Sequence, residues 1–414
     1  MLKAPRGTKD VIPSEVHKWQ YVENIMREVS ARFGYKEVRV PVFEHTEVFQ
    51  RGVGDTTDVV QKEMYTFYDR GGRSITLRPE GTAGVVRCYL ENNLYALPQP
   101  TKMFYLTSCY RYEKPQAGRL REFHQYGVEV LGSQEPVVDA EIIATGVEIL
   151  NRLGIGNITL NINSVGCPDC RREYNKKLRA YFEGKDLCET CLERLEKNPM
   201  RILDCKSPHC HEIGIEAPKI ADNLCQDCAD HFEKVKAQLD AMGIEYKIDK
   251  GIVRGLDYYT KTVFEFVSDN IGSQGTVCGG GRYDGLIEEL GGKPTPGMGF
   301  GMGIERALMV MENCGVEIPE DNGPDIFIVS IGEDAEKYVS SLVSDLRKQG
   351  VCAERDLLAR SVKAQMKYAD KLGAKFTAVI GDDEIKEGKI NLKNMSNGES
   401  VNVSVADVAA EVLK

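Results

Sequence analysis

The sequence predicts an α+β protein made of three kinds of region. Between residues 74 and 132, segments rich in β-branched and aromatic residues follow one another with few helices between them, which is typical of an antiparallel sheet. Residues 167–228 then carry most of the thirteen cysteines of the chain. From Gly323 onward, apolar strands alternate with helices, which indicates a small α/β domain. We therefore expect a β-rich domain interrupted by a cysteine-rich insertion and followed by an α/β domain.

The first expected element is a helix over residues 15–33, because its apolar residues recur at helical spacing. It leads into a strand over 36–44 that carries Pro41 near its middle. Proline removes a hydrogen-bond donor, so this strand is expected at a sheet edge or an interface. The remaining elements expected before the cysteines are strands over 74–80, 101–113, 123–132 and 158–165, with a helix over 137–153.

Composition excludes several classes of protein. An apolar fraction of 42% and a charged fraction of 28% describe a globular chain rather than a disordered one. The net charge of -10 argues against indiscriminate coating of nucleic acid. No apolar run approaches the ~20 residues that span a bilayer, and the first residues lack a signal-peptide core. We expect a cytoplasmic protein without a membrane partner.

One segment carries the residue types of a nucleotide site, although no GxxxxGK[ST] or GxGxxG loop occurs. Arg111 and Glu113 lie two apart and share one face of a strand, and a polar loop returns the chain through Arg119 to Phe123. Guanidinium groups bind phosphate oxygens, and an aromatic ring offers a platform for a purine. Without other motifs, a solvated basic turn would be the favoured interpretation of this segment.

Other motifs are present. The segment just described resembles motif 2 of class II aminoacyl-tRNA synthetases, and Gly299–Arg306 resembles their motif 3. The helix around Trp19 with the strand around Pro41 resembles motif 1, the dimer contact of that class. Five further segments, RPEGT, KPQAGR, FHQYGVEV, RGLDYYTKTVFE and GGGRYD, resemble the bacterial histidyl-tRNA synthetase family. The resemblance covers nearly the whole chain.

The resemblance implies a class II catalytic core with an antiparallel sheet, working as a homodimer. Such an enzyme uses ATP and Mg²⁺ to convert L-histidine to histidyl-adenylate and pyrophosphate, and then transfers histidine to the 3′ end of tRNA-His. The domains expected on this basis are 1–166 and 231–322 as the two parts of the core, 167–230 as the cysteine-rich insertion and 323–414 as the anticodon-binding domain.

The resemblance also implies roles for the basic residues. Negative charge develops on the phosphates during activation, so fixed cations are needed there. The matching positions of motifs 2 and 3 imply that Phe123 stacks on adenine beside Glu113, while Arg119 and Arg306 hold the outer phosphates. Arg254 lies against the α-phosphate, beside the bound histidine. The residues expected to be catalytic are Arg111, which holds the α-phosphate, Arg254 and Arg306.

Histidine presents an ammonium group and an imidazole ring, and the resemblance assigns partners to each. The residues around the ammonium are Glu80, Thr82 and Gln125. The residues around the ring are Glu129, Tyr258, Tyr259 and Tyr283. A carboxylate accepts from one imidazole N–H, and a tyrosine hydroxyl can donate to or accept from the other nitrogen. The ring is thus expected to be recognised at both nitrogens, so no editing segment is needed.

The cysteine block has the spacing of a metal-binding region. Three C-x2-C pairs occur within it, and tetrahedral zinc sites are built from such pairs. The candidate ligands are Cys167, Cys170, Cys188, Cys191, Cys205, Cys210, Cys225 and Cys228. Eight thiols suit two structural Zn²⁺ ions. The alternative is a set of reduced structural thiols, since many relatives lack these cysteines.

The last expected contacts are with tRNA. Lys363, Lys367 and Lys371 recur every four residues and share one helix face. A solvated face explains this spacing alone, but the domain resembles the anticodon-binding module of several class II enzymes. Gln116, in the motif 2 loop, is expected to meet the extra guanosine at the 5′ end of tRNA-His.

Two alternatives are weighed against the histidyl enzyme. One is a noncatalytic regulatory paralogue that serves histidine biosynthesis, which resembles the core but lacks the anticodon module and the histidyl segments. The other is a threonyl or prolyl enzyme with a similar C-terminal module. Glu129, Tyr259 and the segment RGLDYYT argue against the second.

Overall fold

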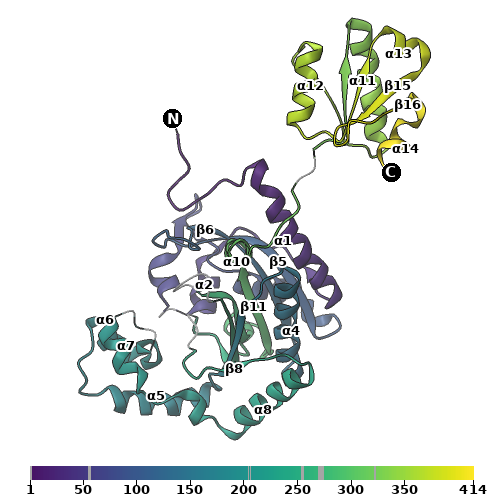
Figure 1. Ribbon diagram of the computed structural model, residues 1–414. Helices are drawn as coiled ribbons and strands as arrows, with labels where there is room; N and C mark the ends of the chain where they lie inside the picture. Colours follow the sequence, from purple (N-terminus) through teal and green to yellow (C-terminus); the bar gives the residue numbers. More distant parts are fainter. Residues whose placement is uncertain are drawn as a thin grey trace. The chain divides into compact units, whose positions relative to one another are not determined.

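The computed structural model describes residues 2–54, 57–203, 205, 207–252, 256–268, 275–320 and 323–414. The chain forms two compact units, Met1–Ile318 and Pro319–Lys414. Figure 1 shows the first unit in purple to green and the second in green to yellow. None of the described helices is long and apolar enough to cross a membrane.

The first unit is built on an eight-stranded sheet. In spatial order its strands are β1 (Lys36–Glu37), β5 (Thr101–Tyr110), β6 (Glu122–Leu131), β11 (Gly297–Gly303), β10 (Thr276–Arg282), β9 (Thr260–Ser268), β7 (Ile158–Ser164) and β8 (Lys247–Ile248). The six central strands pair antiparallel, and only the outer pairs β1–β5 and β7–β8 are parallel. The antiparallel sheet predicted from the sequence is confirmed.

Four helices pack on one face of this sheet and enclose its main core. They are α1 (Pro13–Arg32), α4 (Pro136–Arg152), α8 (Gln226–Ala241) and α10 (Ile304–Asn313). Tyr126, Val128 and Val130 of β6 point into this core. Because side chains alternate along a strand, Gln125 and Glu129 of β6 lie on the opposite face, where the functional site is found.

The single strand predicted over residues 36–44 is wrong. The chain instead forms β1 and then β2 (Phe43–His45), which belong to different sheets on either side of Pro41. A proline cannot donate to a strand ladder, so the pairing stops there. The small second sheet has the order β2, β4 (Ser74–Leu77) and β3 (Tyr65–Tyr68). The short helices near it are α2 (Thr46–Val53), η1 (Val59–Glu63), α3 (Thr82–Glu91), η2 (Leu94–Ala96) and α9 (Leu286–Glu289).

The cysteine-rich segment is helical. It contains α5 (Pro168–Phe182), α6 (Glu189–Lys197), η3 (Pro199–Ile202), α7 (Pro208–Ile215) and η4 (Ile220–Asn223), and it returns to the sheet through α8. Its apolar side chains, among them Tyr174, Leu178 and Ile202, share one core with Tyr258, Tyr259 and Tyr283. The insertion is therefore packed against the tyrosines that the sequence assigns to histidine.

The second unit is a five-stranded sheet of order β13 (Ala353–Arg355), β12 (Ile326–Ser330), β14 (Phe376–Ile380), β15 (Lys389–Asn394) and β16 (Ser400–Ser404). The first three strands are parallel, as a strand-helix alternation predicts. The helices of this unit are α11 (Glu333–Lys348), α12 (Val362–Lys371), α13 (Asp382–Glu387), η6 (Val405–Asp407) and α14 (Val408–Val412).

Candidate active site

Two adjoining cavities open on the face of the sheet opposite α1 and α4. One, of about 210 Å³, is lined by Glu113, Arg119, Phe123, Glu305 and Arg306 among others. The other, of about 190 Å³, is lined by Glu80, Thr82, Tyr258, Tyr259 and Tyr283 among others. Both are bordered by Arg111, Gln125, Gly279 and Gly301. Most residues assigned from the sequence to ATP thus line the first cavity, and most of those assigned to histidine line the second.

Main-chain carbonyl groups hold the arginines of the first cavity. Arg111 follows β5, and its Nε donates to the Pro79 carbonyl at 2.8 Å. Arg306, in the first turn of α10, donates from Nε to the Gly118 carbonyl at 3.1 Å and from Nη1 to that of Thr276 at 2.7 Å. These bonds fix the direction of each guanidinium group without neutralising its charge.

The electrostatics of this cavity suit an anion. Burial, followed by the nearby positive charge of Arg119, lowers the pKa of Arg306. Glu113 forms an ion pair with Arg119, in which Oε2 lies 3.2 Å from Nη1. Like charges held together in a partly buried space raise the free energy of the empty site, and a polyphosphate would lower it.

Phe123 lies beside these charges at the start of β6. The Arg111 guanidinium carbon is 5.4 Å from the centre of the Phe123 ring. Glu305 is also bound, because the His124 main-chain N–H donates to its Oε1 at 2.9 Å. An aromatic face with an arginine on one side is a suitable platform for a purine.

Glu129 is fully buried behind the wall of the second cavity, where two residues that line the cavity bind it. Thr82 donates its hydroxyl to Oε1 at 2.7 Å, and Tyr283 donates to Oε2. Tyr105, which sequence reasoning missed, donates to Oε1 at 3.4 Å. Burial raises the pKa of Glu129 to about 8, although these hydrogen bonds oppose the shift. The signal for Tyr105 was Gly127, which faces it on β6 and leaves room for its ring.

Glu80 and Gln125 border the same cavity in different ways. Glu80 is buried, and it accepts main-chain N–H groups of Thr82 at 2.7 Å and Ala83 at 2.8 Å, at the start of α3. Its carboxylate therefore also caps a helix. Gln125 reaches over Gly301, where an added Cβ would lie 2.2 Å from its Nε2. Gly299 similarly leaves space for Glu129, because a Cβ there would lie 1.9 Å from Oε2. The glycines of β11 therefore make room for the polar side chains of β6.

Three tyrosines close the second cavity. Tyr258 and Tyr259 have ring centres 4.7 Å apart, and those of Tyr258 and Tyr283 are 5.6 Å apart. Tyr283 is anchored by its neighbour Arg282, which is fully buried and donates from Nε to Asp139 Oδ1 at 3.1 Å. Arg254, the remaining residue expected at this junction, lies outside the described residues.

The eight block cysteines form two groups. Cys167, Cys170, Cys225 and Cys228 make the outer cluster, and Cys188, Cys191, Cys205 and Cys210 make the inner cluster; within each, the four sulfur atoms lie within 4.8 Å of one another. The distance from Cys167 Sγ to Cys170 Sγ is 3.6 Å, and that from Cys188 Sγ to Cys205 Sγ is 3.9 Å. A tetrahedral zinc site with Zn–S bonds of about 2.3 Å requires sulfur separations of about 3.8 Å.

Main-chain groups around the clusters also suit thiolates. The N–H of Cys225 donates to Cys170 Sγ at 3.0 Å, and the N–H of Cys188 donates to Cys210 Sγ at 3.2 Å. Cys167, Cys188 and Cys225 each stand at the N-cap of a helix, where the helix dipole favours negative charge. None of the eight cysteines in the two clusters forms a disulfide, so their sulfur atoms can act as ligands.

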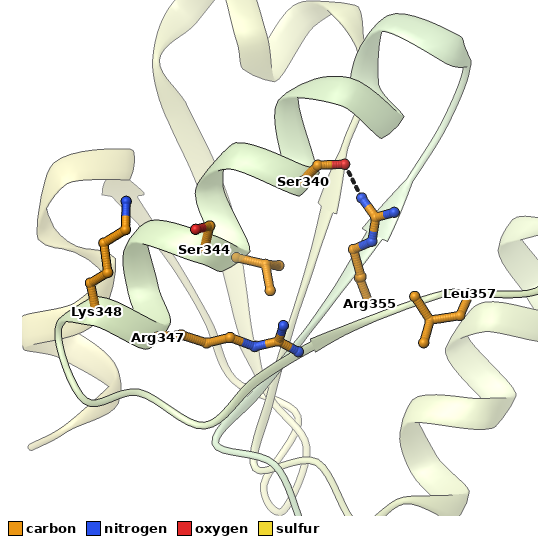
Figure 2. A pocket seen from close by; sticks show the side chains of 7 residues that line it. Ser340, Ser344, Arg347, Lys348, Arg355 and Leu357 are labelled. Atoms are coloured by element: carbon orange, nitrogen blue, oxygen red, sulfur yellow. Dashed lines mark hydrogen bonds between the residues drawn. The ribbon is translucent and has the colours of Figure 1, made fainter.

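The residues expected to bind tRNA are all exposed. Gln116 lies in the loop between β5 and β6, where its main chain pairs with that of Arg119. Lys363 and Lys367 lie on α12 and form no ion pair with another described residue. The second unit also has a groove of about 500 Å³ that sequence reasoning missed. Figure 2 shows the side chains that line it. Its polar lining comes from Ser340, Ser344, Arg347 and Lys348 of α11 and Arg355 of β13.

Known proteins with similar sequences and structures agree with this geometry. Residues 7–307 match the family described as histidyl-tRNA synthetase, and residues 325–414 match the anticodon binding domain. Histidine–tRNA ligase of Acetivibrio thermocellus is 62% identical over 98% of both chains. The corresponding ligase of Clostridioides difficile is 57% identical over 100% of this chain and 99% of its own. The structure of apo S. aureus histidyl-tRNA synthetase superposes with a TM-score of 0.86 at 43% identity, covering 100% of both chains.

Proposed function

The chain belongs to the histidyl-tRNA synthetase family, and from this premise we propose that the two joined cavities hold ATP and histidine for a single reaction. The protein is an ATP-dependent histidine–tRNA ligase: it forms histidyl-adenylate and pyrophosphate, and then charges tRNA-His. Full-length identity to such ligases favours this activity over that of a regulatory paralogue.

The observation that carries the proposal is the shared wall of the two cavities, formed partly by Arg111. Activation requires the histidine carboxylate to attack the α-phosphate, so one cation must serve both substrates at the point of attack. Arg111 has that position. Arg306 and Arg119 hold the outer phosphates, while Phe123 stacks on the adenine beside Glu113. Arg254 is proposed to add a second cation at the α-phosphate.

For the histidine cavity, we propose that Glu129 and Tyr259 form hydrogen bonds to the imidazole ring, with Tyr258 and Tyr283 beside them. Glu80, Gln125 and the main chain near Thr82 receive the ammonium group. We propose a further role for Thr82: its hydroxyl donates to Glu129 and would orient the carboxylate that accepts from the ring. Tyr105 supports the same carboxylate.

Mg²⁺ is proposed to enter on the phosphates of ATP, where it would neutralise charge on the leaving pyrophosphate. The carboxylates available to it are those of Glu113 and Glu305, which line the ATP cavity. Two structural Zn²⁺ ions are proposed in the outer and inner cysteine clusters, on the strength of the sulfur separations and the N–H donors around them.

The second unit is proposed to bind the anticodon region of tRNA-His. Lys363 and Lys367 present exposed charge on α12, and the groove between α11 and β13 adds Arg347, Lys348 and Arg355. Gln116 is proposed to meet the extra 5′ guanosine.

We also propose a homodimer through the segment around Pro41, where Val42 and Phe43 are 42% and 55% exposed. We also propose a cytoplasmic location, because eight of the thirteen cysteines form the two clusters rather than disulfides.

The proposal is tested by histidine-dependent exchange between ATP and labelled pyrophosphate in the full-length protein. Exchange should require histidine and Mg²⁺, and it should not occur with threonine or proline. Metal analysis of protein purified without chelators should give two Zn²⁺ per chain. Exchange with another amino acid but not with histidine would reject the assignment of the second cavity.

A further inference from the structure

Asp257 is the residue through which the cysteine-rich insertion contacts the histidine cavity. It immediately precedes Tyr258 and Tyr259, which line that cavity. Its Oδ1 accepts from Arg201 Nη2 at 2.7 Å and from Nε at 3.2 Å. Its main-chain carbonyl accepts from Arg171 Nη1 at 3.1 Å. The insertion thus holds both the side chain and the main chain of the residue next to the two tyrosines.

Both arginines stand close to the cysteine clusters. Arg171 follows Cys170 of the outer cluster, in the first turns of α5. Arg201 lies in η3, between Cys191 and Cys205 of the inner cluster. A metal ion that joins the four sulfur atoms of a cluster also fixes the short segments that carry them. A bound ion would therefore also restrict the segment that carries each arginine.

The contact is buried enough to transmit this dependence. The Arg201 side chain is only 9% exposed, and Arg171 is partly buried. Charge-assisted hydrogen bonds are strongest in such surroundings. Apolar packing adds to them, because Tyr258 and Tyr259 share a core with Cys191, Ile202 and Cys210. A shift of the inner cluster would move the wall of the histidine cavity by both routes.

We infer that the insertion is a metal-ordered support for histidine recognition, in which Zn²⁺ in the two clusters positions Arg171 and Arg201 on Asp257, and thereby Tyr258 and Tyr259. The inference rests on the proposed histidine cavity and zinc sites, and it adds that zinc affects one substrate selectively. The ATP cavity is lined by none of these residues. Arg171 and Arg201 are positioning residues in this scheme.

The first test is Arg201→Met in the zinc-loaded, full-length protein. Loss of a hydrogen bond to a charged group should raise the KM for histidine in the exchange reaction by about tenfold or more. The KM for ATP should change by less than about twofold. Arg201→Lys should recover part of the histidine affinity, because it retains the charge without the fork geometry. Arg172→Met is the matched control, since Arg172 is 67% exposed and pairs with Asp169.

The second test removes zinc by chelation, with circular dichroism used to confirm that the helices remain. Zinc-free wild-type protein should show the same selective rise in the KM for histidine. Chelation of Arg201→Met should add less than it does in the wild type, because both changes act on Asp257. The inference is overturned if Arg201→Met leaves the histidine KM unchanged, if both substrates are affected equally, or if zinc removal is without effect.

The results that overturn this inference can be distinguished from those that would reject the proposed histidine cavity or the proposed zinc sites. Wild-type protein without histidine-dependent exchange would reject the histidine cavity, and native protein without zinc would reject the metal sites. Either result also overturns the inference, and each is seen before any variant is made.

Discussion

The two cavities that meet at Arg111 treat charge in opposite ways. In the ATP cavity, Arg111 and Arg306 donate to neutral carbonyl groups, and Glu113 Oε1 lies 3.9 Å from Arg111 Nη1, so the positive charge of the two arginines is only partly compensated before a ligand binds. In the histidine cavity, the carboxylates of Glu80 and Glu129 are already surrounded by N–H and hydroxyl donors. The first arrangement stabilises developing negative charge, and the second selects a ligand that can join an existing network. Rate and specificity should therefore respond to different substitutions.

The largest expected effect is on rate. Arg306→Met removes one fixed cation from the ATP cavity, and the exchange rate should fall by roughly 10²- to 10³-fold, the usual consequence of losing one charge-stabilising donor. Histidine affinity, measured by calorimetry without ATP, should remain within about twofold because Arg306 does not line the second cavity. A matching loss of histidine affinity would remove the distinction between the two cavities.

The next effect is on specificity. Glu129→Gln should weaken histidine binding by roughly 10- to 100-fold, because a charged acceptor for the imidazole N–H is lost. The KM for ATP should hardly change. Tyr105→Phe is the matched comparison and should cost less, since its hydroxyl lies 3.4 Å from Glu129. Equal losses in the two variants would mean that Glu129 acts through the network alone and does not touch the ring.

Two glycines of β11 differ in how closely side chains pack against them at the histidine end and at the ATP end of the strand. Gly299→Ala would bring a methyl group to 1.9 Å from Glu129 Oε2 and 2.3 Å from the main-chain oxygen of Val128. Both the carboxylate and the paired strand must then move, at a cost of about 1–3 kcal/mol of stability. Histidine affinity should fall with it. Gly303→Ala, at the ATP end of the same strand, meets nothing closer than 3.7 Å and should be tolerated. Thermal unfolding and histidine titration of both variants measure the difference.

The sequence predicted much of this molecule, and the failures have physical causes. The β-branched and aromatic composition of two segments located β5 and β6. The motifs predicted that Arg111, Glu129 and Arg306 surround one site. Residues 36–44 were predicted to form one strand, but β1 and β2 pair with different sheets on either side of Pro41. The partner strands are distant in the sequence, so local composition could not show where one sheet ends and the other begins. Tyr105 was missed because its role requires Gly127 on a different strand. The pairing of eight cysteines into two clusters depends on how α5 and α8 return to each other, which no spacing in the sequence determines.

The smallest effect concerns pH. Burial raises the pKa of Glu129 from 4.5 to about 8, so the folded state binds this proton more tightly than the unfolded state does. The stability that Glu129 contributes is therefore complete below about 4.5 and is lost as the pH rises through about 8. Glu129→Gln resembles the protonated form and should lose less thermal stability between pH 6 and pH 9, a range of roughly one to two units around that pKa.

Scanning calorimetry of the wild-type protein and of Glu129→Gln, both without ligand, measures this difference in the pH dependence of thermal stability. His124 is present in both proteins and contributes equally to the two profiles. Glu305 raises the pKa of His124, so its contribution also falls with rising pH but cancels in the comparison. Saturating histidine should flatten the wild-type profile, because an imidazole N–H favours the ionised carboxylate. Identical slopes with and without Glu129 would show that the hydroxyl donors already keep this carboxylate charged, and the contrast between the two cavities would then rest on Glu80 alone.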